Sequence, residues 1–137
     1  MRLRLLLLLC CFFALATSLT GCDSVFQCKG NVFEWVDAPN YKEGEIYVNE
    51  LPPELPPEGY NLQPIASAKI SFDGGKLAVL SSDNEGKFEY WSVVPPVEYN
   101  MKITVEKDGY YPVEKKFRFY GDSGEFYFTV MLVRKDK

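Results

Sequence analysis

The side chains that most often carry enzyme chemistry are sparse in this 137-residue chain. Histidine is absent, which removes Ser/His/Asp and Cys/His nucleophile arrangements, histidine metal sites and imidazole acid–base catalysis. Carboxylates remain, but they are spread over turns, and no pair stands where one pKa would be raised for glycoside hydrolysis. We therefore expect a protein that is not an enzyme and that needs no cofactor.

Asp83, Asn84 and Glu85 are possible calcium ligands. They lack the alternating spacing of a calcium-binding loop, and no bidentate glutamate follows at the required distance. Asp83 as a turn residue before a strand, with Gly86 at positive φ, explains the same residues. The sequence therefore predicts no metal site.

Aromatic residues make up 15% of the chain and are the remaining candidates for binding. Two tryptophans could offer flat faces to a sugar ring if they were exposed and coplanar, although such residues more often close the ends of a sandwich core. Three tyrosines are interleaved with prolines in residues 38–63. The candidate surface for a protein or carbohydrate partner is therefore Trp35, Tyr41, Tyr47, Tyr60 and Trp91.

Residues 38–63 form a segment too long for an ordinary connection between strands. Its stretch Leu51–Gly59, LPPELPPEG, favours an extended polyproline conformation, and Glu45–Asn49 could add a short edge strand. One interpretation is a recognition arm that offers aromatic faces or a preformed extended segment to a partner. The other is a stiff cover over the sandwich that hides an edge strand or an apolar face.

The first residues have the pattern of a secretory signal. Arg2 and Arg4 precede the apolar run Leu5–Ala16, whose 12 residues fall short of the about 20 that span a bilayer as a helix. Leu19-Thr20-Gly21-Cys22 follows and resembles the lipobox of bacterial lipoproteins, in which the cysteine receives a diacylglyceryl group before cleavage on its amino side. The resemblance implies lipidation of Cys22, export, and a membrane as partner through the lipid, at the periplasmic or extracellular face.

Charge balance after the signal bears on partners, and cysteine use there agrees with export. Without Arg2 and Arg4 the chain has 13 basic and 19 acidic side chains, a balance that repels nucleic acid. Cys28 would be the one remaining thiol, either buried and inert or available for an intermolecular bridge, and we favour the buried state. If Cys22 were not lipidated, a Cys22–Cys28 disulfide would be the alternative.

The rest of the chain has the pattern of strands separated by turns. In Tyr99–Glu106 apolar residues alternate with polar ones, which is typical of an antiparallel strand in a half-buried sheet. The last apolar run has two apolar faces, so something must cover Tyr127, Met131 and Val133. Strands are predicted near 28–35, 64–72, 76–81, 86–92, 99–106, 112–119 and 125–133. The fold class predicted is all-β, a seven-stranded antiparallel β-sandwich.

Four motifs in this order resemble the carboxypeptidase regulatory-like domain. They are Gly30-Asn31-Val32, Pro64–Ile70, Ser82–Phe88, and Tyr99–Val105 followed by Asp108-Gly109-Tyr110. The resemblance implies a transthyretin-like antiparallel sandwich in an accessory, non-catalytic module. The chain departs from the family at Ser82, where threonine is usual, and at the insertion 38–63.

These observations predict a signal peptide at 1–21, a lipidated tether at 22–28 and one sandwich domain at 29–137 with a Pro/Tyr-rich insertion at 38–63. The expected function is that of a lipid-anchored, non-catalytic binding or structural module at the bacterial cell envelope. A carbohydrate-binding accessory protein and an inhibitor of an envelope or secreted enzyme remain as alternatives.

Overall fold

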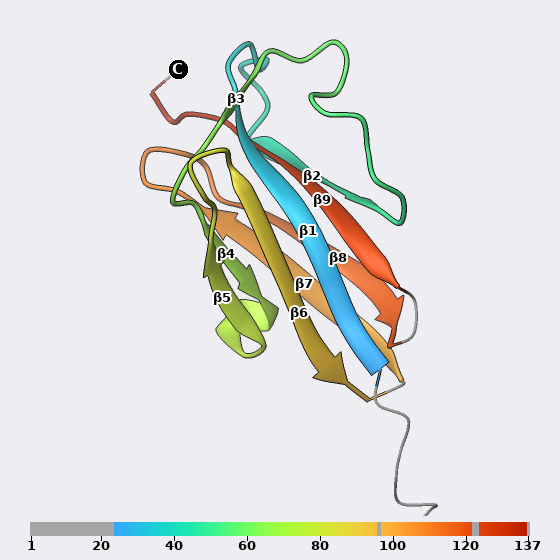
Figure 1. Ribbon diagram of the computed structural model, residues 1–137. Helices are drawn as coiled ribbons and strands as arrows, with labels where there is room; N and C mark the ends of the chain where they lie inside the picture. Colours follow the sequence, from blue (N-terminus) through green and yellow to red (C-terminus); the bar gives the residue numbers. More distant parts are fainter. Residues whose placement is uncertain (1–23, 96, 122–123, 137) are drawn as a thin grey trace, which may run out of the picture.

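The computed structural model describes residues 24–95, 97–121 and 124–136, which form two β-sheets around one apolar core (Figure 1). The prediction of an all-β sandwich is confirmed. A single 3₁₀ turn, Asp73–Gly75, is the one helical element in these residues. The strands are β1 (Ser24–Trp35), β2 (Gly44–Asn49), β3 (Leu62–Pro64), β4 (Lys69–Phe72), β5 (Ala78–Ser81), β6 (Lys87–Val94), β7 (Glu98–Glu106), β8 (Val113–Tyr120) and β9 (Glu125–Leu132).

The first strand, β1, lies inside the larger sheet. It pairs with β9 along one edge, and β2 continues the sheet beyond β9. The other edge of β1 is shared, because β6 pairs with Ser24–Asn31 and β3 with Phe33–Trp35. The second sheet has the order β5-β4-β7-β8.

The strands are antiparallel except for β1 and β9, which run parallel from the Gln27–Glu125 pair to the Glu34–Leu132 pair. The prediction of a wholly antiparallel sandwich is therefore wrong at this pair. Alternation along a strand shows which side chains face the core, and it is the same for both orientations of the neighbouring strand. The two strands are also far apart in the sequence, so no hairpin turn reveals their pairing.

The described chain has nine strands where the sequence predicted seven. One addition is β2, at the place where Glu45–Asn49 was considered as a possible edge strand. The other arises because the predicted strand 64–72 divides into β3 and β4, which belong to different sheets. Ser67 has a positive φ of 58° at the division. The buried Ser82 hydroxyl fixes this crossing by donating to the Ile65 carbonyl (2.7 Å) and accepting from the Ala68 N–H (2.9 Å).

The predicted tether is too long, because β1 already begins at Ser24 and takes in most of residues 22–28. Phe26 and Cys28 point into the core and are fully buried, which explains why this short stretch joins the sheet. The predicted signal peptide and Cys22 lie outside the described residues. Within those residues, no helix has the length and apolarity needed to cross a membrane.

Phenylalanines fill the core between the two sheets. Phe26 of β1 contacts Phe72 of β4 edge-on, with ring centroids 5.7 Å apart, and Phe119 of β8 at 4.7 Å. Gly30 lets the ring of Phe88, on the adjacent strand β6, lie against the backbone of β1. A Cβ at this position would lie 2.1 Å from that ring. The sheet can therefore hold a large aromatic ring against the backbone of its central strand.

The alternation predicted for β7 is confirmed. Met101, Ile103 and Val105 are buried in the core, whereas Asn100 and Glu106 are exposed.

This register predicts opposite outcomes for two neighbouring substitutions. Ile103→Ala removes a fully buried side chain and should lower the free energy of unfolding by about 2 to 5 kcal/mol. Lys102→Ala removes only a long ion pair with Glu114 (3.6 Å) at the surface and should cost less than about 1 kcal/mol. Urea unfolding of the unlipidated domain measures both, and a larger loss for Lys102→Ala would contradict the register.

Candidate functional site

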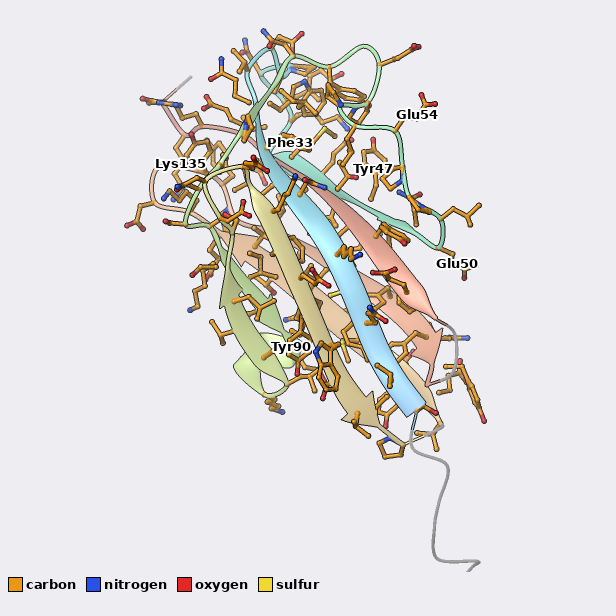
Figure 2. The ribbon with its side chains drawn as sticks, viewed as in Figure 1. Phe33, Tyr47, Glu50, Glu54, Tyr90 and Lys135 are labelled. Carbon is orange, nitrogen blue, oxygen red and sulfur yellow. The ribbon has the colours of Figure 1, made fainter. Side chains whose placement is uncertain are left out.

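The insertion is ordered at both ends and forms an arch between them. Residues 44–49 are β2, residues 62–64 are β3, and the segment Glu50–Gly59, here called the proline arch, leaves β2 and returns along the sandwich to β3 (Figure 1). Figure 2 shows Glu50 and Glu54 of this segment on the same side of the molecule as Tyr47. The insertion is therefore built into the sheet and is not a free arm.

The first end of the insertion is held by a network of polar side chains. The Tyr47 hydroxyl donates to the Glu45 carboxylate and lies 3.4 Å from the Tyr60 hydroxyl, and the Lys42 ammonium donates to Glu45 at 2.6 Å. The hydrogen bonds from Lys42 and Tyr47 stabilise the carboxylate and lower the pKa of Glu45. The same bond to Glu45 raises the pKa of Tyr47 and keeps its phenol protonated.

A second apolar cluster covers the far end of the larger sheet. Trp35, Met131 and Val133 are buried on the outer face, under Ala38, Tyr60, Leu62 and Tyr111. Tyr60 contacts Trp35 edge-on, with ring centroids 5.1 Å apart. The outer face predicted to need a cover at Met131 and Val133 is therefore covered by the ends of the insertion together with Tyr111 from the connection between β7 and β8.

The five aromatic residues proposed as a partner surface do not form one surface. Trp35 is only 8% exposed, so its use as an open platform is ruled out by the packing of the second cluster. Tyr60 packs against Trp35, and the Tyr47 hydroxyl lies near that of Tyr60. Tyr41 is 80% exposed on the loop before β2. Trp91 is 64% exposed on the outward side of β6, away from the other four.

The proline arch and the outer face of the larger sheet enclose a cleft of about 470 Å³, here called the outer cleft. This volume is in the range of small-ligand sites. The arch contributes apolar rings and a leucine, and the floor comes from three adjacent strands and the turn before β6. The lining residues are Pro52, Pro53 and Leu55 above, and Lys29, Gly30, Asn31, Asp83, Lys87, Phe88, Glu89, Tyr127 and Phe128 below.

Charges of both signs alternate over the floor of the outer cleft. Lys29 Nζ lies 3.4 Å from Glu125 Oε1, and the Tyr127 hydroxyl donates to the other oxygen of Glu125 at 2.8 Å. The bond to Glu125 and the charge of Glu89 raise the pKa of Lys29, so the ammonium is held charged. The floor therefore presents charged and polar side chains together with the Tyr127 ring, whereas Phe88 and Phe128 point into the core beneath it. Polar groups below and apolar side chains of the arch above are an arrangement suited to binding.

Asp83, at the rim of the cleft, acts as a turn residue. Its carboxylate accepts the N–H groups of Glu85 and Lys87, both at 2.9 Å, and Gly86 follows with a positive φ of 77°. This is the role expected from the sequence. Within the described ranges, no group of three or more His, Cys, Asp or Glu residues is placed to hold a metal ion.

Cys28 is a buried thiol in the core, as predicted. Burial disfavours the thiolate and raises the pKa of Cys28 to about 12, so the side chain is protonated and unreactive at neutral pH. Its proposed disulfide partner, Cys22, lies outside the described residues.

A second, shallow concavity of about 560 Å³ lies on the other sheet, lined in part by Lys102, Lys116 and Arg118. Arg118 pairs with Glu98 at 3.1 Å and Lys102 with Glu114 at 3.6 Å. These carboxylates offset the positive charge, which leaves this face less suited to an anionic ligand.

The sequence did not reveal the floor of the outer cleft. Its residues come from β1, β6 and β9, which are separated in the chain and become neighbours only through the pairing of these strands. The sequence does show that Lys29 and Asn31 alternate with inward-facing residues of β1 and therefore point outward. Alternation alone does not distinguish a binding face from a solvated one.

Comparison with known proteins assigns no family. No protein-family model and no curated protein matches the chain. A solved structure with a similar arrangement is the crystal structure of 3-chlorocatechol 1,2-dioxygenase from Rhodococcus opacus 1CP, with 11% identity and a TM-score of 0.46 over 84% of this chain and 61% of that chain.

Replacing residues 51–59 with a short Gly/Ser linker should leave the domain folded and monomeric. The residues that pack over the second cluster are Ala38, Tyr60, Leu62 and Tyr111, and all four stay in place. A flexible connection adds only a slowly growing closure entropy. Size-exclusion chromatography and thermal unfolding of the unlipidated domain measure the result.

The matched variant is Tyr60→Ala, which uncovers the second cluster and should lower stability by roughly 1 to 3 kcal/mol and promote self-association. If the protein with residues 51–59 replaced were destabilised and self-associated, the arch itself would be the cover of the outer apolar face, and the prediction would be wrong.

Proposed function

We propose that the protein is a lipid-anchored, non-catalytic β-sandwich module of the bacterial cell envelope that binds a partner in the outer cleft. The observation that carries this proposal is the cleft itself. Its roof is the segment in which the chain departs most from the family it resembles. The roof offers apolar side chains, and the floor offers charges of both signs. Binding sites commonly lie on loops that a rigid scaffold positions.

The lipid anchor rests on the resemblance of Leu19-Thr20-Gly21-Cys22 to a lipobox behind an apolar run. In the described chain β1 begins at Ser24, two residues after Cys22. A lipid on this cysteine would precede every described strand and leave the outer cleft available for binding outside the membrane. At least two acyl chains are needed for stable attachment, which a diacylglyceryl group supplies.

We also propose that the sandwich is of the transthyretin-like, carboxypeptidase regulatory-like class. Support comes from the places where three of its motifs meet. The Val32 N–H of the first motif donates to the Gly86 carbonyl of the third at 2.7 Å, and the Ile65 N–H of the second donates to the Val32 carbonyl at 2.9 Å. Residues of the three motifs are therefore hydrogen-bonded to one another where the chain crosses from one sheet to the other.

The chemistry of the outer cleft favours an extended segment of a protein partner. Pro52, Pro53 and Leu55 offer apolar contacts from above, while Lys29 and Glu89 lie opposite each other across β1 and β6 below. Such a site suits a peptide that carries charges of both signs.

Cys22→Ser should abolish labelling of the protein by a clickable palmitate analogue in growing cells, because it removes the sulfur that would carry the lipid. The matched control is Cys28→Ala, which should keep the label because Cys28 is buried in the core. Gel fluorescence of the immunoprecipitated protein measures both. Label retained by Cys22→Ser would overturn the anchor.

A benzophenone amino acid at Leu55 should give a discrete crosslinked adduct in irradiated cells, because Leu55 lines the outer cleft and is 39% exposed. The control position is Val79, which is 55% exposed on β5 of the other sheet. The adduct should disappear when Asn31→Trp fills the cleft and persist when Asn100→Trp fills the concavity on the other sheet. Equal adducts at both positions, or none, would contradict binding in the cleft.

A further inference from the structure

Exposed apolar side chains gather at the end of the sandwich where the described chain begins. Of the ten large hydrophobic residues that are exposed among the described residues, five lie at this end. They are Val25 (45% exposed), Trp91 (64%), Val93 (54%), Val97 (50%) and Tyr120 (48%), here called the tether rim.

Strand pairing brings the members of the tether rim together. Val25 and Val93 are direct partners across β1 and β6, and Trp91 lies opposite Gln27 two residues along. Val97 lies in the turn after β6, where its carbonyl accepts the Gly121 N–H at 3.1 Å, and Tyr120 is the register partner of Glu98. The rim thus runs from the outer face of β1 and β6 around the end of both sheets.

The chain between the tether rim and the proposed anchor is short enough to place the rim at the membrane surface. Cys22 precedes Ser24 by two residues, so the lipidated backbone lies within about 7 Å of the start of β1. Val25 follows immediately, which leaves no spacer to carry the domain away from the bilayer. A lipid at Cys22 therefore holds this end of the sandwich at the level of the headgroups.

The residue types of the rim suit that position. Tryptophan and tyrosine have an apolar ring and a polar group, and they are enriched at the boundary between water and bilayer. Of the charges near the rim, Arg118 pairs with Glu98 and Lys29 with Glu125, and Glu89, two residues before Trp91 on β6, adds a further negative charge. Because the chain without Arg2 and Arg4 has 13 basic and 19 acidic side chains, its net negative charge gives no attraction to anionic lipids, and the apolar surface must supply the contact.

We propose that the tether rim, with Trp91 as its central aromatic residue, docks on the lipid surface and fixes the orientation of the domain on the membrane. This inference rests on the lipid anchor proposed above. The anchor makes docking an intramolecular event with a high effective concentration, so a patch too small to bind a membrane by itself can remain in contact. The outer cleft then stands at a fixed tilt beside the membrane.

The experiment uses the full chain, processed in a bacterial host and reconstituted in phosphatidylcholine vesicles with or without brominated acyl chains, which quench tryptophan at short range. Trp35 is an internal reference, because it lies at the other end of β1, roughly 35 Å from Ser24. Bromine should quench the part of the emission that Trp91 contributes, and Trp91→Phe should remove the quenching. High salt should leave the result unchanged.

A matched variant carries the probe at the far end. In the Trp91→Phe background, Tyr41→Trp places an indole at a position that is 80% exposed in the loop before β2. Its emission should not be quenched. Equal quenching of this probe would overturn a defined orientation.

Flotation of the vesicles separates this inference from the proposed function. Protein that floats while Trp91 is unquenched would overturn docking of the rim, which would then face water or a protein partner, and would leave the anchor intact. Protein that does not float would overturn the anchor and with it both proposals. Flotation with quenching at Trp91 alone supports both.

Discussion

The parallel pairing of β1 with β9 is the constraint on which the rest of the structure depends. It joins the beginning of the described chain to its end along the middle of the larger sheet. Because the two strands run in the same direction, both begin near Ser24 and both end beside Trp35 and Val133. Three features therefore lie at this one end of the sandwich. They are the second apolar cluster, the ends of the insertion, and the ion pair between Arg134 and Glu34 at 2.8 Å.

This arrangement divides the outer face of the larger sheet into zones. At the far end, side chains of the insertion cover Trp35 and Met131. In the middle, the proline arch stands over the floor formed by Lys29 and Asn31 and encloses the outer cleft. Towards Ser24 the face is open, and Trp91 and Val93 are exposed. One strand, β1, thus passes from a covered zone through a partly covered one to an open one, and each zone has its own chemistry.

Strand-level features could be predicted from the sequence because they depend on local alternation and turn chemistry. The buried face of β7, the turn at Asp83-Gly86 and the burial of Cys28 all follow from side-chain type and spacing. The parallel partner of β1 could not be predicted, since alternation does not encode orientation. The division of strand 64–72 depends on a buried contact with Ser82, which comes from a distant part of the chain.

The candidate site was predicted only in part for the same reason. Proline and tyrosine content pointed to the insertion, and the structure places its central segment over a cleft. The selection of Trp35 failed because exposure depends on what packs above a residue, here Tyr60. The floor residues Lys29 and Tyr127 were unremarkable as sequence, and they acquire a role only through the pairing of β1 with β9.

The orientation of β1 and β9 also determines how the domain bears mechanical load. A pull on the chain before Ser24 draws β1 towards its own beginning, while an opposing pull beyond Arg134 draws β9 towards its end. In a parallel pair these two forces act along the strands in opposite directions, so the hydrogen bonds from Gln27–Glu125 to Glu34–Leu132 are loaded together in shear. They cannot open one at a time, as the bonds of a hairpin pulled apart at its open end do. A domain held on a membrane at one end and pulled through its last strand would therefore resist tension through its central strand pair.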